Sequence, residues 1–233
     1  MEYYRTEKGQ IYADIAYRLG RIITQYEKLN VNEEKFEATL YIAVLQNLLT
    51  NCSEHVKQMT QQPDSIFQKE IESVGWGLNK CCWVENKYEE KLILENFINR
   101  VRNSISHPTE IKIERDYPST GYTTIKDDSG IIKKFRFIDS PDTMWNRQWG
   151  FKKEEEIKEY IRRNKKTFPE NIHYKKSGTK FFLSINDEPF IRIAIVDLTV
   201  EELASFVKNL ANYLAQPILD NWDGKTIKWL LAA

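Results

Sequence analysis

Residues 94–108 read LENFINRVRNSISHP, and the character of the chain changes where this stretch ends. Its apolar side chains recur at the three- and four-residue steps that align them on one face of a helix. They are Leu94, Phe97 or Ile98, Val101 and Ile105. Pro108 stops the pattern, because proline lacks an N–H and disfavours helical backbone in the residue before it. The stretch therefore predicts an amphipathic helix that stops at Pro108.

Three earlier apolar stripes predict three more helices. The first consists of Ile11, Ile15, Leu19, Ile22, Tyr26 and Leu29. The second consists of Phe36, Leu40, Val44 and Leu48, joined by Tyr41, Leu45 and Leu49. Because this second helix is apolar around most of its girth, we expect it to lie centrally. The third consists of Phe67, Ile71, Val74, Leu78 and Cys82, although Gly75 and Gly77 lie within it and oppose helix there.

Beyond Pro108 the pattern is that of strands, with short segments rich in Ile, Phe, Tyr and Thr between turn residues. The candidate strands are Glu110–Glu114, Tyr122–Lys126, Ile131–Ile138, Thr179–Ile185 and Phe190–Val196. The sequences DDSG at 127–130 and NDEP at 186–189 predict hairpin turns. Residues 152–166 instead predict a helix, because acidic residues come early and basic residues late, which complements the helix dipole.

A last helix is expected from Thr199, which forms a capping box with Glu202 and lies between the apolar pair Leu198 and Leu203. Its apolar stripe consists of Leu203, Phe206 or Val207, Leu210, Tyr213 and Leu214. The expected fold class is α+β: mainly an α-helical antiparallel bundle with a small antiparallel β-sheet inserted. The bundle would comprise residues 1–109 and 198–233, and the β-rich insertion with its one helix residues 110–197.

Composition narrows the classes of function. The 233 residues include 34 Lys and Arg and 34 Asp and Glu, so the net charge is zero. A surface that is basic throughout is thereby excluded, which leaves only a local basic groove for a nucleic acid. The three cysteines form no CxxC pair, which argues against a disulfide framework or a zinc ribbon. We find no signal-peptide pattern and no membrane-length apolar run, so we expect a cytoplasmic protein. We also expect no metal or cofactor.

Residues that could carry chemistry gather at the end of the helix over 94–108. Arg102 supplies a permanent charge shaped for phosphate oxygens, and His107 can move a proton near neutral pH. Together they suit cleavage of an RNA phosphodiester, with histidine acting on the ribose 2′-hydroxyl and arginine stabilising the transition state. On a regular helix Arg102 lies about 140° around from His107, whereas Arg100 and Asn103 share a stripe with it. Pro108 favours a bend that would carry His107 off the helix.

The alternative is structural, because cations in the last turn of a helix neutralise its dipole and bond the last carbonyls. Placement at the close of a bundle helix favours chemistry, since the segment RNSISHP at 102–108 resembles the R-x4-6-H motif of the HEPN superfamily. The resemblance is specific over Asn99–Pro108 and architectural over the helices of 9–107 and 199–216.

The resemblance implies a homodimeric, metal-independent endoribonuclease whose two motifs meet at the dimer interface, often a toxin or an anti-phage effector. Arg102 and His107 would be catalytic, with Asn103 as the polar residue after the arginine, but Arg100 also satisfies the looser spacing. An antitoxin or another regulatory partner would fit such a protein. Many HEPN relatives keep the fold only as a binding module, so a non-catalytic scaffold for RNA, a nucleotide or a protein is the second hypothesis.

Further candidates for contacting RNA lie inside and outside the motif: Arg100, Ser106, Arg162 and Arg163. The basic end of the helix over 152–166 either contacts the RNA backbone or is a solvated helix end. Four nearby aromatic residues either stack on bases or belong to the core; they are Trp145, Trp149, Phe151 and Tyr160. Cys52 and His55 could join Cys81 or Cys82 at a zinc ion, but the spacing favours plain buried side chains.

Overall fold

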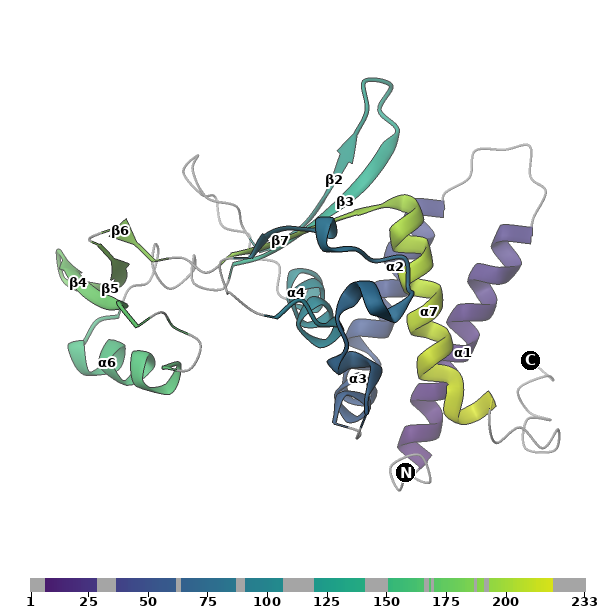
Figure 1. Cartoon of the computed structure of the whole chain (residues 1–233), viewed down its shortest axis with the longest axis horizontal. Coiled ribbons are helices and arrows are strands. Elements are labelled where there is room, and N and C mark those ends of the chain that lie inside the picture. Colours follow the sequence, from purple (N-terminus) through teal and green to yellow (C-terminus); the bar gives the residue numbers. More distant parts are fainter. Residues whose placement is uncertain are drawn as a thin grey trace. The chain divides into compact units, whose positions relative to one another are not determined.

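A computed structural model describes residues 7–28, 37–61, 64–86, 91–106, 120–140, 151–165, 168, 170–186, 188–190 and 193–219 (Figure 1). The chain divides into two compact units. The first comprises residues 1–78, 93–95 and 199–233, and the second comprises residues 79–92 and 96–198. Helices and strands both contribute substantially, so the fold is α+β, as expected from the change of pattern at Pro108.

The first unit contains the helices α1 (Glu7–Lys28), α2 (Glu37–Thr50), α3 (Ser53–Thr60) and α7 (Val200–Leu219). Helix α7 packs against both α1 and α2, and Figure 1 shows α1 and α7 side by side in opposite directions. The second expected helix is confirmed as α2, and its residues Leu45, Leu48 and Leu49 are fully buried.

The face of α1 that packs inward differs from the face that the large apolar residues predicted. Ala13, Ala16 and Ile23 are fully buried, whereas Ile11 and Ile22 are 51% and 46% exposed. Small side chains explain the difference, because they let two helix backbones come close together. A Cβ atom added at Gly20 would lie only 3.6 Å from Cβ of Ala211 on α7. Close packing, rather than the size of the side chains, therefore decides the buried face of α1.

The long helix expected over residues 67–82 is wrong. The chain forms three short 3-10 turns there, η2 (Ile66–Gln68), η3 (Ile71–Val74) and η4 (Lys80–Cys82). Gly75 and Gly77 adopt φ values of 73° and 78°, a left-handed conformation that ends any right-handed helix. Phe67, Ile71, Leu78 and Cys82 of the stripe are nevertheless buried, and Val74 is partly buried. Phe67, for example, packs edge-on against Tyr213 with ring centroids 5.4 Å apart.

The capping box expected at the start of α7 is confirmed. The backbone N–H of Thr199 donates to Oε2 of Glu202 over 2.9 Å, and the N–H of Glu202 donates to Oγ1 of Thr199 over 3.1 Å. Both donors would otherwise lack a partner in the first turn of the helix. The box therefore fixes the residue at which the chain leaves the sheet and returns to helix.

The second unit contains a four-stranded sheet in the order β1-β7-β3-β2. Its strands are β1 (Trp83–Asn86), β2 (Gly121–Lys126), β3 (Ile132–Asp139) and β7 (Ala194–Thr199). Strand β1 pairs antiparallel with β7, and β2 pairs antiparallel with β3. The strands expected at 122–126 and 131–138 are confirmed, and the turn between them is closed by Oδ1 of Asp127, which accepts from the N–H groups of Ser129 and Ile131.

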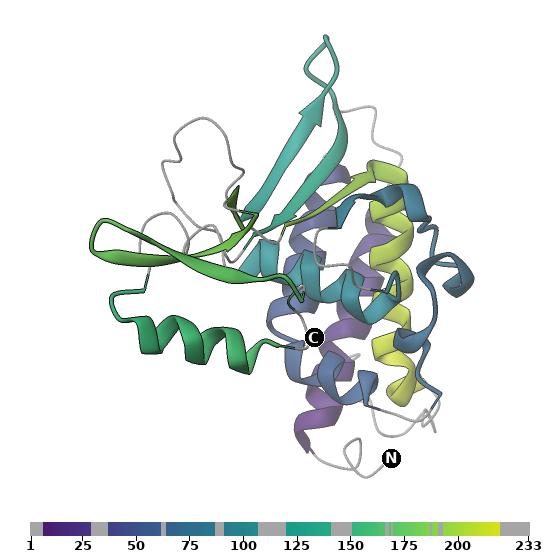
Figure 2. The ribbon, with the colours of Figure 1, turned by 60° about the vertical axis from the view of Figure 1, so that its left-hand side comes forward.

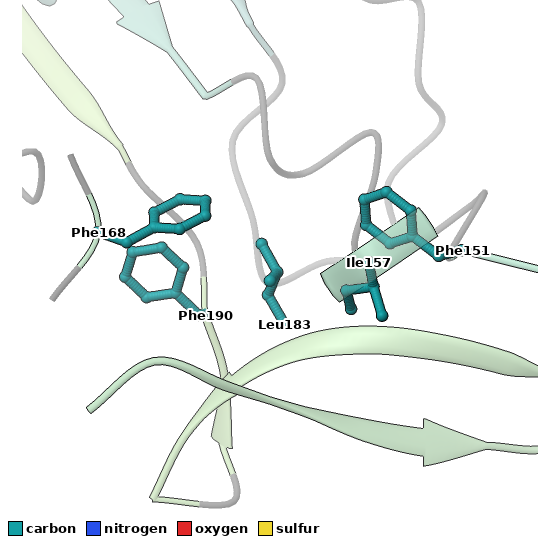
Figure 3. Packing of buried hydrophobic residues seen from close by; sticks show 5 residues of the cluster. All are labelled: Phe151, Ile157, Phe168, Leu183 and Phe190. Carbon is teal, nitrogen blue, oxygen red and sulfur yellow. The ribbon is translucent and has the colours of Figure 1, made fainter. Parts of the chain in front are cut away.

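A smaller three-stranded sheet in the same unit has the order β4-β5-β6. Its strands are β4 (His173–Ser177), β5 (Lys180–Ile185) and β6 (Glu188–Pro189), and it packs on helix α6 (Glu154–Arg163). Figure 3 shows the core between them, formed by Phe151, Ile157, Phe168, Leu183 and Phe190. Tyr160 packs against the same cluster, so Phe151 and Tyr160 are core residues rather than platforms for bases.

Some expectations fall on residues that the structure does not describe. The strand expected at Glu110–Glu114 lies outside the described residues, and so do Trp145 and Trp149. The strand expected at 190–196 begins at Ala194 as β7, while β1 and β4 had no counterpart among the expected strands. Glu188 and Pro189, expected in the turn at 186–189, form the short strand β6. Among the helices described here, none has both the length and the apolar composition needed to cross a membrane.

Candidate functional site

Helix α4 (Leu94–Ser106) carries the residues that the sequence singled out, and its apolar stripe is buried as expected. Phe97 and Val101 have no exposed surface, and Ile105 is only 5% exposed. Within the second unit, the Phe97 ring packs edge-on against Trp83 of β1, with ring centroids 6.2 Å apart. Burial of one face fixes the rotation of α4 about its axis, and it thereby decides where the polar residues of the other faces point.

Arg100 and Asn103 lie one turn apart on α4, and both bind the same carboxylate. Nη1 of Arg100 donates to Oδ2 of Asp139 over 2.7 Å, and Nδ2 of Asn103 donates to the same oxygen over 3.0 Å. Asp139 is the last residue of β3 and is 1% exposed. Oγ of Ser104 also donates to the carbonyl oxygen of Arg100 over 2.8 Å. The carboxylate therefore ties one polar edge of α4 to the end of β3.

Asp139 is the residue of this site that the sequence analysis missed. A signal was present in residues 135–139, which read FRFID, because alternate residues of a strand share one face. Phe135 and Phe137 are 2% and 1% exposed, and Asp139 continues their alternation. An acidic side chain in phase with buried aromatic residues must be paired, since an unpaired buried charge is costly. That pattern predicts an ion pair, although it does not identify Arg100 as the partner.

Arg102 has a different environment from Arg100. Two residues along a helix correspond to a rotation of about 200°, so the two arginines point to nearly opposite sides of α4. Arg102 is partly exposed, and its guanidinium makes no hydrogen bond with any residue that the structure describes. An arginine in this state can bind an external anion without giving up an internal ion pair.

The end of α4 adds one buried hydroxyl. Oγ of Ser106 is buried and has no hydrogen-bond partner among the described residues. A buried hydroxyl usually finds a partner, so such an atom in a described helix calls for an explanation. His107 follows Ser106 directly in the sequence and lies outside the described residues.

Arg162 and Arg163, the other arginines expected to contact RNA, are ion-paired at the end of α6. Nε of each lies 2.7 Å from a carboxylate oxygen of Glu159. These hydrogen bonds lower the pKa of the Glu159 carboxyl to about 2. Both arginine side chains are 73% exposed, so the pairing stays in water and is easily exchanged. The order of charges along α6, acidic first and basic last, is as expected.

Cys52 and His55 each contact a backbone carbonyl oxygen within the first unit. Nε2 of His55 donates to the carbonyl oxygen of Leu214 over 2.9 Å, and Sγ of Cys52 points to the carbonyl oxygen of Tyr12 at 3.9 Å. Burial lowers the pKa of the His55 imidazole and raises the pKa of the Cys52 thiol to about 11. Both shifts favour the neutral side chains of a core. In the part of the chain that is described, no group of three His, Cys, Asp or Glu residues could hold a metal ion.

Comparison with known proteins gives one match. The model of the family described as HEPN pEK499 p136 matches residues 1–171. The match includes helices α1, α2, α3, α4 and α6 and the hairpin of β2 and β3, and therefore Arg102, His107 and Asp139. Neither the comparison with curated proteins nor the comparison with solved structures found a match.

Proposed function

Because the chain belongs to the HEPN pEK499 p136 family, we propose that it is an endoribonuclease that cleaves RNA through the ribose 2′-hydroxyl without a metal ion. HEPN domains are generally associated with ribonuclease or nucleotide-related functions. The observation that carries the proposal is that the two arginines of α4, Arg100 and Arg102, have different environments. Asp139 binds Arg100 and Asn103, whereas the guanidinium of Arg102, on another side of the helix, makes no hydrogen bond with the described residues.

In the proposed reaction, the imidazole of one His107 takes the proton of the 2′-hydroxyl. The 2′-oxygen then attacks phosphorus, and the bond from phosphorus to the 5′-oxygen breaks. Arg102 binds the phosphate oxygens and stabilises the charge that builds on them in the transition state. The products are a 2′,3′-cyclic phosphate and a 5′-hydroxyl. The hydroxyl of Ser106 is a further donor for a phosphate oxygen.

A homodimer belongs to the same proposal. The leaving 5′-oxygen needs a proton, and a single histidine cannot give a proton and take one in the same step. Two copies of the chain would supply two His107 side chains, one as base and one as acid. RNA is the substrate, the chain acts as a toxin or an anti-phage effector in the cytoplasm, and an antitoxin or another regulatory partner controls it.

The proposal extends to the architecture. We assign residues 1–109 and 198–233 to a HEPN-like antiparallel helical bundle and residues 110–197 to a β-rich insertion. Packing of α7 on α1 and α2 supports the first assignment, and the strands β2 to β6 support the second. In this arrangement Arg100 and Asn103 are positioning residues, because they attach the motif helix to Asp139.

The test is cleavage of a mixed RNA pool by purified protein with EDTA present throughout. We expect the wild type to cut, and His107→Ala and Arg102→Ala to lose cutting while they remain folded. Arg18→Ala is the matched control, because Arg18 lies on α1 in an exposed ion pair with Asp14. Cyclic phosphate and 5′-hydroxyl ends support the mechanism, whereas 5′-phosphate ends contradict it. Binding of RNA without cutting by the wild type would favour a non-catalytic scaffold.

A further inference from the structure

The small sheet of the second unit has two faces of different character. Neighbouring side chains along a strand point to opposite faces, and directly paired residues point to the same one. Tyr174 pairs with Leu183 and Lys176 pairs with Phe181, and the three apolar residues of these pairs pack with the core beside α6. The hydroxyl of Tyr174 also donates to Glu154 of α6 over 2.6 Å. These pairs define the inner face of the β4–β5 hairpin, which lies along α6 in Figure 2.

The alternate pairs define the outer face: Lys175 with Phe182, His173 with Ser184 and Ser177 with Lys180. Phe182 is partly exposed, lies outside the apolar cluster on the inner face and has no ring contact with any described residue. Lys175 and His173 are exposed, whereas Ser184 is only 2% exposed, so the accessible part of this face lies around Lys175, Phe182 and Lys180. Paired side chains in an antiparallel sheet have Cβ atoms about 5 Å apart, so the Lys175 chain starts beside the Phe182 ring.

The two faces also differ in charge. Among the residues of β4 and β5 that the structure describes, the outer face has two lysines and no acidic side chain. Of the acidic residues nearby, Glu154 and Glu159 lie on α6, which covers the inner face, whereas Glu170 precedes β4 and Glu188 begins β6, where it pairs with Ile185. A chain whose net charge is zero therefore presents, on this outer face, an aromatic ring among positive charges.

We propose that the outer face of β4 and β5 binds single-stranded RNA, with one base stacked on Phe182 and the backbone phosphates on Lys175 and Lys180. Unpaired bases stack on exposed aromatic rings, and lysines beside the ring bind the phosphates. The inference rests on the proposed function, since it gives the ribonuclease a contact for its substrate away from Arg102 and His107. An acidic protein would need the lysines but would gain little from a ring suited to a flat base, so the ring favours RNA.

Lysines on β4 also have a structural explanation, because β4 is an edge strand and charged residues protect edges from pairing with other chains. The chain offers a matched pair that separates the two explanations. Lys175 and Lys176 are adjacent and exposed on β4, but Lys175 lies on the outer face and Lys176 on the inner face, where its Nζ is 5.7 Å from the Phe181 ring centroid. If the lysines only protect the edge strand, Lys175 and Lys176 are equivalent. If the outer face binds RNA, only Lys175 contributes to binding.

The experiment measures binding of a fluorescent 12-nucleotide single-stranded RNA to His107→Ala protein, in which cleavage is blocked. We expect Phe182→Ala and Lys175→Glu each to weaken binding by about tenfold, and Phe182→Trp to retain it. Lys176→Glu should stay within about twofold of the parent. Lys175→Glu should also reduce the slope of log affinity against log salt by about 0.7, the value for one phosphate contact on a single strand.

Cross-linking of the parent protein to RNA that contains 5-iodouridine gives a readout that does not depend on folding of the variants. A cross-link at Phe182 supports the proposal, and cross-links elsewhere with none at Phe182 overturn it. Equal losses in Lys175→Glu and Lys176→Glu, or competition by polyglutamate as strong as by RNA, also overturn it. Because binding is read in His107→Ala protein, RNA bound on this face without cutting by the wild type refutes only the proposed reaction.

Discussion

Oδ2 of Asp139, at the end of β3, lies 2.7 Å from Nη1 of Arg100 on α4, and the carboxylate side chain is only 2% exposed. The two residues are 39 positions apart in the chain, so their ion pair attaches the helix that carries the motif to the sheet. A buried charge is tolerated only when it is paired and hydrogen-bonded. Asn103 supplies the second hydrogen bond to the same oxygen.

Loss of the Asp139 carboxylate should destabilise the protein, because Arg100 would keep a largely buried charge without its partner. For Asp139→Ala we expect the free energy of unfolding to fall by about 3–5 kcal/mol, and for Asp139→Asn to fall by less. Urea denaturation measures both. Asp128→Ala is the control, since Asp128 is exposed in the turn between β2 and β3 and should cost little. An Asp139→Ala protein as stable as the wild type would contradict the pairing.

Two glycines of the first unit allow a test of steric fit at equal backbone conformation. Gly75 and Gly77 have φ values of 73° and 78°, so alanine at either costs about 1–2 kcal/mol of stability through its backbone. A Cβ atom at Gly75 would meet nothing within 4 Å, whereas at Gly77 it would lie 2.7 Å from Oγ of Ser205. Gly77→Ala should therefore lower the melting temperature more than Gly75→Ala. Equal losses would mean that α7 adjusts to remove the clash.

Burial of His55 should make stability depend on pH. Burial lowers the pKa of the folded imidazole below its ordinary value of 6.5, so the unfolded chain binds this proton more readily than the folded chain. The contribution of His55 is fully present above about pH 6.5 and is lost as the pH falls through the folded pKa. Urea midpoints from pH 7.5 to 5 should thus decline, and His55→Leu should reduce that decline. The Cys52 thiol beside it stays neutral throughout, because burial raises its pKa to about 11. An unchanged decline in His55→Leu would assign it to other groups.

Apolar periodicity predicted the elements whose local pattern and packing agree, namely α1, α2, α4 and α7 and the strands β2, β3 and β5, while the order of charges predicted α6. Apolar periodicity failed where the secondary structure of a segment is decided by a special backbone conformation or by a partner that is distant in the sequence. The stripe over 67–82 has the helical period, but it contains two left-handed glycines. Strand β1 has only four residues, and its Trp83 pairs with Val196, more than a hundred positions later. Strand β4 reads HYKKS, and lysine-rich segments do not resemble strands unless they are known to lie at an edge.

In the candidate site, too, the features set by a local pattern were predicted and those set by a distant partner were not. The arginines and the apolar stripe of α4 were evident from the sequence, because one helix holds them all. The choice between Arg100 and Arg102 was open, since both fit the loose spacing of the motif. The structure adds that Asp139 binds Arg100 and Asn103 from 39 and 36 positions away, and no local pattern records those partners.

Replacement by alanine should therefore affect different properties at the two arginines: mainly the cleavage rate at Arg102 and mainly the stability at Arg100. Arg102→Ala removes a guanidinium without an internal hydrogen bond in the described structure, so stability should stay within about 0.5 kcal/mol of wild type. Its cleavage rate should fall about 10²–10³-fold, the usual cost of one lost transition-state donor. Arg102→Lys should recover only part of that rate, because lysine lacks the planar fork that binds two phosphate oxygens.

Arg100→Ala should instead lower the urea midpoint, because the buried Asp139 carboxylate loses its charged partner. Its cleavage rate, measured well below the new midpoint, should fall less than that of Arg102→Ala. A double-mutant cycle with Asp139→Ala isolates the pair, and the coupling should exceed about 1 kcal/mol. If Arg100→Ala abolished cleavage at full stability, Arg100 would be the catalytic arginine of the motif and the ion pair with Asp139 would have to open when RNA binds.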